Sequence, residues 1–293
     1  MKILIVGKNS YVGRSVQAWF AKKESAPVVE AISVREDGWR QMDFSEFDAV
    51  IFTAALVHRP DITDTELYEK LNVQLPLDFA RHVKRQGVER FVFLSTVSVY
   101  KASRSLPEGC VIDSTTPLEP DSLYGQSKLR AERLLSELDD ETFHVSVIRS
   151  TYVYGPGCRG THISALHRLA RTLPVLPKAF PKAALGMVYH ENLAELCWLI
   201  VHSDCSGVYM AQDAAPLSTY QVLKTMEPKK PEFPCTALFR PFVWASLVKR
   251  LFGGSRYSEE LSRCPLGNYQ LVSPAEGIRR TIEAAECAKK ESV

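Results

Sequence analysis

Apolar residues in the first half of the chain fall into short continuous runs separated by amphipathic or polar stretches. Each run has the length of a strand, and its lack of apolar–polar alternation is typical of a strand buried on both faces of a parallel sheet. The runs are Lys2–Val6, Val28–Val34, Asp48–Ala55, Phe91–Leu94 and His144–Ile148. Helical patterns separate several of them, so the chain is predicted to adopt an α/β fold with a doubly wound parallel sheet.

Two long helices are expected beside this sheet. One is Thr65–Gln86, which Pro76 should kink and Gly87 should end, and the other is Ser122–Leu138. Beyond Gly155 the pattern loosens, and the helices expected there include 239–252 and 274–288. The predicted domains are a sheet domain of residues 1–155 and 188–212 and a smaller, irregular lobe of residues 156–187 and 213–293.

Composition narrows the range of partners. The formal net charge of +2 gives no argument for a nucleic acid or an anionic membrane, and no apolar stretch is long enough to span a bilayer. The first run follows Met1 directly, which leaves no room for a signal peptide. The seven cysteines are scattered without a C-x-x-C pair, which predicts reduced thiols rather than disulfides or a zinc site. We therefore expect a cytoplasmic protein without a metal ion, a nucleic-acid partner or a membrane partner.

A glycine turn follows the first strand. Gly7 and Gly13 enclose five residues, and an amphipathic helix begins behind them. A strand, turn and helix in this order direct backbone N–H groups and the positive end of the helix towards a pyrophosphate. Ser10 stands where a G-x-x-G-x-x-G pattern would have glycine, so the match is incomplete. The arrangement predicts a Rossmann-type dinucleotide-binding domain.

The end of the second strand bears on the choice of cofactor. An acidic residue there would bind the 2′-hydroxyl of NAD(H), whereas an arginine accommodates the 2′-phosphate of NADP(H). This chain has Ser33 and Arg35. The cofactor is therefore NADP(H) or NAD(H), with Arg35 favouring NADP(H) unless its side chain is merely solvated in a loop.

Tyr124 and Lys128 stand four residues apart and share one helix face with Ala131, Leu135 and Leu138. Lysine is seldom placed on such an apolar stripe, because burying an unpaired ammonium is costly. A partly desolvated ammonium beside a phenol should lower the pKa of the tyrosine and fit it for general acid–base catalysis. The alternative is a surface tyrosine beside a lysine whose ammonium reaches solvent.

Seven motifs in this order resemble those of the extended short-chain dehydrogenase/reductases. They are Gly7–Gly13, Asp43-Phe44, Thr53-Ala54-Ala55, Asn72, Ser95-Thr96 with Val99-Tyr100, Tyr124-x-x-x-Lys128 and Val153-Tyr-Gly-Pro156. More narrowly, the chain resembles the NAD-dependent epimerase/dehydratase family, and GKNSYVG and FLSTVSVY are similar to members from bacterial surface-polysaccharide pathways. The resemblance implies hydride transfer at C4 of a nucleotide-activated sugar, by a 4-keto reductase or a 4-epimerase, and allows for a homodimer.

The resemblance also implies residue roles. Tyr124 would be the acid–base group, Lys128 would hold the nicotinamide ribose, and Thr96 would hydrogen-bond the reacting oxygen. The residues expected at the cofactor are Gly7, Asn9, Ser10, Tyr11, Val12, Gly13, Arg35, Asp43, Phe44, Thr53, Ala54, Ala55, Asn72, Tyr124, Lys128, Thr151 and Val153, with Asp43 and Phe44 at the adenine and Asn72 chiefly supporting the active-site helices. The residues expected at the substrate are Thr96, Ser98, Tyr124, Tyr152, Arg159 and His162.

One departure from the family pattern concerns the substrate. Many members carry an arginine that binds the diphosphate where this chain has Leu185 and Gly186. Either Arg159, Lys178 or Lys182 replaces it, or the substrate is not an ordinary nucleotide sugar. The alternatives are therefore a reductase of a non-nucleotide keto substrate and a non-catalytic dinucleotide-sensing regulator on the same fold.

Overall fold

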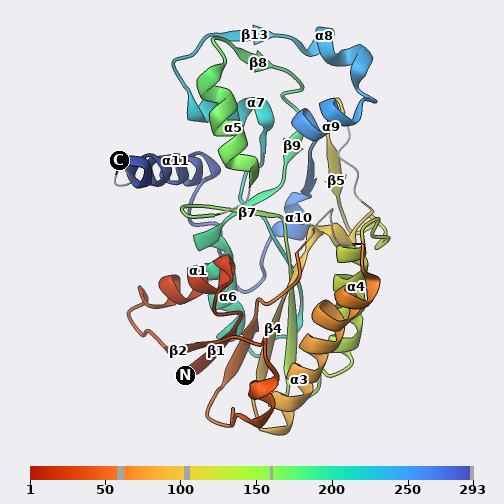
Figure 1. Cartoon of the computed structure of the whole chain (residues 1–293), viewed down its shortest axis with the longest axis vertical. Helices are drawn as coiled ribbons and strands as arrows, with labels where there is room; N and C mark the ends of the chain where they lie inside the picture. Colours follow the sequence, from red (N-terminus) through yellow and green to blue (C-terminus); the bar gives the residue numbers. More distant parts are fainter. Residues whose placement is uncertain (58–62, 102–105, 159–160, 291–293) are drawn as a thin grey trace.

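A six-stranded parallel sheet forms the centre of the computed structural model, which describes residues 1–57, 63–101, 106–158 and 161–290 (Figure 1). The strands lie in the order β2 (Val28–Ile32), β1 (Lys2–Val6), β3 (Ala49–Phe52), β4 (Arg90–Thr96), β6 (His144–Ser150) and β11 (Gly207–Ala211). Every neighbouring pair is parallel. The predicted α/β class with a Rossmann-type sheet is confirmed.

Helices cover both faces of the sheet, which explains the continuous apolar runs. Leu4 and Val6 pack into a core with α3 (Leu75–Arg85) and α4 (Leu123–Ser136). Ile3 and Ile5 point to the opposite face and pack with α1 (Tyr11–Phe20) and α6 (His190–Val201). Each such side chain, fully buried, stabilises the fold by about 1.5–3 kcal/mol, which favours apolar residues on both faces of the central strands β1 and β3.

The strand order opens a crevice at one end of the sheet. The chain leaves β1 towards β2 on one side and then crosses to β3 on the other side. The connections that follow β1 and β3 therefore diverge at the carboxyl ends of these strands, which is where this fold type binds ligands. The connection from β2 to β3 contains the 3-10 turn η1 (Asp37–Gln41). β2 is the last strand in the order and therefore lies at the edge of the sheet.

The predicted helix over residues 65–86 is interrupted before Pro76. It consists of α2 (Thr65–Glu69), a π-helical turn η2 (Lys70–Gln74) and α3. Pro76 has no N–H to donate to the carbonyl of Asn72, which accounts for an irregular turn at this point. Gly87, with φ of 87°, follows the end of the helix as predicted.

Smaller elements form a lobe beyond the crevice, at the upper end of Figure 1. They are α5 (Thr161–Thr172), α7 (Thr219–Met226), the paired strands β8 (Leu176–Lys178) with β13 (Glu232–Pro234) and β9 (Ala184–Leu185) with β12 (Leu217–Ser218), then α8 (Thr236–Phe239), η4 (Arg240–Phe242) and α9 (Ser246–Phe252). Two further pairs, β7 (Tyr152–Tyr154) with β10 (Met187–Tyr189) and β5 (Cys110–Ile112) with β14 (Ser255–Tyr257), complete the described strands. No helix within the described ranges is long and apolar enough to cross a membrane.

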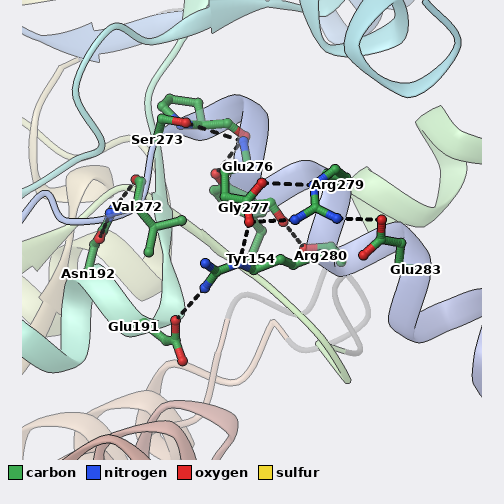
Figure 2. A network of polar contacts seen from close by, with 12 residues as sticks. Tyr154, Glu191, Asn192, Val272, Ser273, Glu276, Gly277, Arg279, Arg280 and Glu283 are labelled. Atoms are coloured by element: carbon green, nitrogen blue, oxygen red, sulfur yellow. Dashed lines mark hydrogen bonds and ion pairs between the residues drawn. The ribbon is translucent and has the colours of Figure 1, made fainter.

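The C-terminal part of the chain returns to the sheet domain through α10 (Glu259–Ser262) and α11 (Pro274–Lys290). Asn192 of α6 exchanges two hydrogen bonds with the backbone of Val272, at 2.8 and 2.9 Å. Arg280 of α11 contacts Glu191 of α6 at 3.1 Å (Figure 2). Part of residues 213–293, which we expected in the lobe, therefore lies against α6.

Candidate active site

A cavity of about 500 Å³ occupies the crevice at the carboxyl ends of β1 and β3. Most of the residues predicted to bind the cofactor line it. They are Gly7, Asn9, Ser10, Tyr11, Val12, Arg35, Thr53, Ala54, Ala55 and Tyr124. The structure thus brings together residues from the first 55 positions and from α4, which the sequence separates by about seventy residues.

The two glycines of the turn permit a close backbone approach. Gly7 has φ of 115°, and a Cβ there would lie 2.6 Å from Oγ1 of Thr53. A Cβ on Gly13 would lie 2.8 Å from Oγ of Ser10. Neither position accepts a side chain without displacing its neighbours, so the turn can lie flat against β3 and leave the cavity open.

Ser10 explains the missing glycine of the motif. It is the N-cap of α1, where its Oγ accepts a hydrogen bond from the N–H of Gly13 at 2.8 Å and lies 2.7 Å from Oγ1 of Thr53. The first helical N–H groups, those of Tyr11 and Val12, have no intrahelical acceptor. A helix start of this kind suits a pyrophosphate, so the residues present fit a dinucleotide.

Tyr124 reaches the cavity from the first turn of α4, whose N-cap is Ser122. A Cβ on Gly125 would lie 2.3 Å from the carbonyl oxygen of Ser98, so only glycine allows α4 to approach the end of β4 this closely. This approach places Tyr124 within hydrogen-bonding reach of Thr96. Gly125 was not among the predicted site residues, although it directly follows the tyrosine.

Burial dominates the electrostatics of the acid–base pair. It raises the pKa of Tyr124 to about 12, with Tyr68 adding to the rise and the hydrogen bond from Thr96 opposing it. Burial also lowers the pKa of Lys128 to about 7, although Glu132 acts to raise it. The ammonium lies 3.8 Å from the centre of the Phe93 ring.

The lowering of the Tyr124 pKa by Lys128 stays a prediction, because burial raises this pKa in the structure. The ammonium is absent from the groups that act on the phenol, and it loses much of its own charge near neutral pH. Desolvation disfavours the charged form of both groups.

A buried ion pair joins α4 to β6. The sequence analysis did not predict it. Glu132 lies 2.7 Å from the guanidinium of Arg149 and accepts a hydrogen bond from Ser95. Arg149 also donates to the hydroxyl of Tyr100 at 2.8 Å. The spacing Tyr-x-x-x-Lys-x-x-x-Glu on one helix face, facing an arginine inside an apolar strand, is the signal that could have revealed this pair.

Asn72 supports the site without lining the cavity. Its Oδ1 accepts a hydrogen bond from the N–H of Leu56 at 2.8 Å, and its Nδ2 donates to the carbonyl of Leu56 and to Oγ of Ser127. It therefore joins the segment after β3 to α4, which is the supporting position expected for it.

Several predicted cofactor residues lie elsewhere. Phe44 is fully buried in the core, and exposed Asp43 accepts a hydrogen bond from the N–H of Ser45, so neither side chain lines the cavity. The connection after β2 holds the 3-10 turn η1, and Phe44 beyond it packs in the core with Phe79. Thr151 is buried and donates to the carbonyl of Ala211.

A second cavity, of about 600 Å³, lies between β7, α5 and α11. Tyr152 and Val153 line it, and the ring of His162 lies 5.4 Å from that of Tyr152. Tyr11 of the first cavity lies close to Gly155 of the second, because a Cβ on Gly155 would be 2.6 Å from its hydroxyl. Ser98 exchanges hydrogen bonds with Thr96, and neither residue is among those that line the first cavity. Arg159 lies outside the described residues.

The structure explains why no arginine occupies positions 185 and 186. Leu185 is buried in the core of the lobe, and a Cβ on Gly186 would lie 2.7 Å from the side chain of Gln212. Of the expected substitutes, Lys178 pairs with Glu232 and Lys182 with Glu108.

Two other cations line the second cavity: Arg168 and Arg171, both exposed on α5. Neither forms an ion pair with any residue that the structure describes. Across the same described ranges, no group of three or more His, Cys, Asp or Glu side chains could hold a metal ion.

Comparison with known proteins identifies the family of this chain. The model of the NAD dependent epimerase/dehydratase family matches residues 3–208, and the chain belongs to this family. It is 24% identical to the UDP-glucose 4-epimerase of Vibrio cholerae over 292 residues, which cover 94% of this chain and 88% of the relative. It is 28% identical to the N-acetyl-alpha-D-glucosaminyl-diphospho-ditrans,octacis-undecaprenol 4-epimerase of Escherichia coli O157:H7 over 242 residues, which cover 77% of this chain and 71% of the relative.

Solved structures share the fold. A UDP-glucuronic acid 4-epimerase from Bacillus cereus, in complex with UDP-glucuronic acid and NAD, superposes with a TM-score of 0.73 at 17% identity, covering 98% of this chain and all of that one. The Bordetella bronchiseptica enzyme WbmG, in complex with NAD, superposes with a TM-score of 0.72 at 18% identity, covering 98% and 94%. The predicted family and the predicted class of NAD(P)-dependent enzyme are confirmed.

Proposed function

We propose that this chain catalyses NAD(P)-dependent hydride transfer at C4 of an activated sugar, as a 4-epimerase or a 4-keto reductase of bacterial surface-polysaccharide biosynthesis. The observation that carries the proposal is the placement of Tyr124 on the dinucleotide crevice, within hydrogen-bonding reach of Thr96. The 4-epimerase activity of both curated relatives supports the choice of C4.

The nicotinamide, when bound, supplies the acceptor or donor of the hydride. Tyr124 takes the proton of the C4 hydroxyl at its phenolic oxygen when the sugar is oxidised, and returns it when the ketone is reduced. Thr96 donates a hydrogen bond to the same sugar oxygen. Lys128, on the next turn of the helix, would hold the ribose of the nicotinamide.

Of these two activities, the 4-keto reductase is favoured by the protonation state of free Tyr124. A phenol with a pKa of about 12 carries its proton at neutral pH, which is the form that protonates a C4 ketone. Exposed Arg35 lines the same cavity, and a 4-keto reductase would use NADPH. An epimerase must instead run both directions on one bound cofactor.

A further part of the proposal concerns the diphosphate that joins the sugar to its carrier. A diphosphate needs cationic partners, and Arg168 and Arg171 are the cations that line the second cavity. The relative from Escherichia coli acts on a sugar joined through a diphosphate to undecaprenol, so a lipid diphosphate is tested beside a nucleoside diphosphate. A homodimer and a cytoplasmic location stay predictions.

The experiment combines the purified chain with NAD or NADPH and with UDP-glucose, UDP-N-acetylglucosamine, their 4-keto derivatives, or a diphospho-undecaprenol sugar. Epimerisation at C4 is followed by NMR, and reduction by loss of NADPH absorbance. Tyr124→Phe should lower turnover by roughly 10²–10⁴ with nearly unchanged cofactor affinity. The control is Tyr220→Phe, whose hydroxyl pairs with Glu232 in the lobe. Tight dinucleotide binding without turnover of any substrate would favour the regulator instead.

A further inference from the structure

The segment of residues 233–251 runs through the lobe from β13 to α8 and α9 (Figure 1), and it exposes several large apolar side chains. Trp244 is 83% exposed, in the turn between η4 and α9. Five other large apolar side chains within residues 233–251 are between 37% and 65% exposed: Phe233, Leu238, Phe242, Leu247 and Leu251. We call these six residues the lobe-tip face. Six exposed large apolar side chains within nineteen residues exceed the scattered single residues that are normal on a protein surface.

This segment is apolar on its inner side as well. Val248 and Phe252 of α9 are buried in a cluster with Phe180, and Phe239 and Val243 pack against the same cluster. The inner side chains pack the segment onto the lobe. The outer apolar side chains therefore stay exposed although the segment itself is folded.

Basic residues are frequent in the segment that carries the lobe-tip face. Residues 227–254 hold five basic and two acidic side chains, so this short segment is more positive than the whole chain, whose net charge is +2. Exposed Arg240 and half-buried Lys249 form no ion pair with any described residue. The ammonium of Lys249 lies 5.2 Å from the centre of the Trp244 ring. Tryptophan, leucine and phenylalanine beside lysine and arginine are typical of segments that lie in a membrane interface.

We propose that the lobe-tip face docks on the surface of an anionic phospholipid bilayer. The apolar side chains enter the boundary between headgroups and acyl chains, and the basic residues contact lipid phosphates. A second copy of the same face is a poor occupant, because two positive segments would repel each other. The net charge of the whole chain does not reveal this segment, because it averages the segment with acidic residues elsewhere.

Flotation of the full chain with vesicles tests the proposal, using phosphatidylcholine alone and phosphatidylcholine with about 30% phosphatidylglycerol. The chain should float with the anionic vesicles and be released by salt. Trp244→Ala with Leu247→Ala should lower the partition coefficient about tenfold or more. Arg240→Gln with Lys249→Gln should lower it about fivefold per charge. Leu271→Ala, 52% exposed but outside the face, should float as wild type does.

Two further measurements separate the outcomes. Emission from Trp244, one of four tryptophans, should shift to shorter wavelength on anionic vesicles and lose that shift in Trp244→Phe. Light scattering without lipid reports self-association. No flotation, equal flotation of the face variants, or a dimer that Trp244→Ala dissolves without any lipid binding would each overturn the proposal. Tyr124→Phe should float normally, since docking does not rest on the proposed reaction.

Discussion

The carboxylate of Glu132 lies 2.7 Å from the guanidinium of Arg149, and this ion pair is buried between α4 and β6. Glu132 stands one helical turn beyond Lys128 and raises the pKa of that lysine against the effect of burial. The pair that holds α4 on the sheet therefore also sets the electrostatic surroundings of the active site.

Glu132→Gln should destabilise the fold by about 3–5 kcal/mol, because it leaves the guanidinium of Arg149 buried without its counter-charge. Urea unfolding monitored by circular dichroism measures the loss. Glu132→Gln combined with Arg149→Met removes both charges and should be more stable than the single variant. If the double variant is the less stable of the two, the unpaired charge is not the cause.

Lys128→Met should stabilise the protein while abolishing turnover. Burial lowers the folded-state pKa of Lys128 from 10.5 to about 7. At neutral pH the charged lysine is therefore more favourable in the unfolded chain than in the folded one, which lowers the free energy of unfolding. After the loss of the contact with the Phe93 ring, the gain should be on the order of 2–4 kcal/mol, or roughly 3–6 °C in melting temperature.

The pH dependence of that difference has a definite sign. Between pH 7 and pH 10.5 the unfolded state binds a proton at Lys128 that the folded state does not, so wild-type stability from this group rises with pH. The difference in the free energy of unfolding between Lys128→Met and wild type should be largest below pH 7 and should become smaller towards pH 10. An advantage that grows with pH would show that Lys128 is charged in the folded state.

Arg35→Ala should weaken binding of NADPH about tenfold or more and leave NADH unchanged. A charge-assisted contact with the 2′-phosphate contributes about 1.5–3 kcal/mol, and NADH has no such group. Calorimetric titration with both cofactors measures the difference. Arg40→Ala, whose side chain pairs with Asp78, is the control. A loss confined to Lys8→Ala, which also lines the cavity, would assign the phosphate to Lys8 instead.

Arg168→Ala with Arg171→Ala should weaken UDP binding about tenfold or more and spare NADP(H), because these guanidinium groups line the second cavity. Arg279→Ala on α11 is the matched control, since its side chain is occupied by Glu276 and Glu283. Arg159→Ala is measured in parallel. If it alone loses UDP binding, the substitution expected from the sequence is the right one.

The sheet, the glycine turn and the pair Tyr124 and Lys128 could be predicted from the sequence because their signals are local or periodic. A strand buried on both faces must be apolar throughout, and a helix face repeats every three or four residues. Even Ser10, which broke the glycine pattern, is a common helix N-cap whose role follows from local geometry.

Only the tertiary structure decided which of these residues meet and how strongly they are desolvated. Phe44 lies in the core and Leu185 inside the lobe, Glu132 is paired with Arg149, and Trp244 is left uncovered. Each outcome depends on segments distant in the chain, since burial and pairing are properties of the surroundings and not of the residue. The pKa of Tyr124 rose rather than fell for the same reason: spacing along a helix places two groups together, but the packing around them sets the cost of their charge.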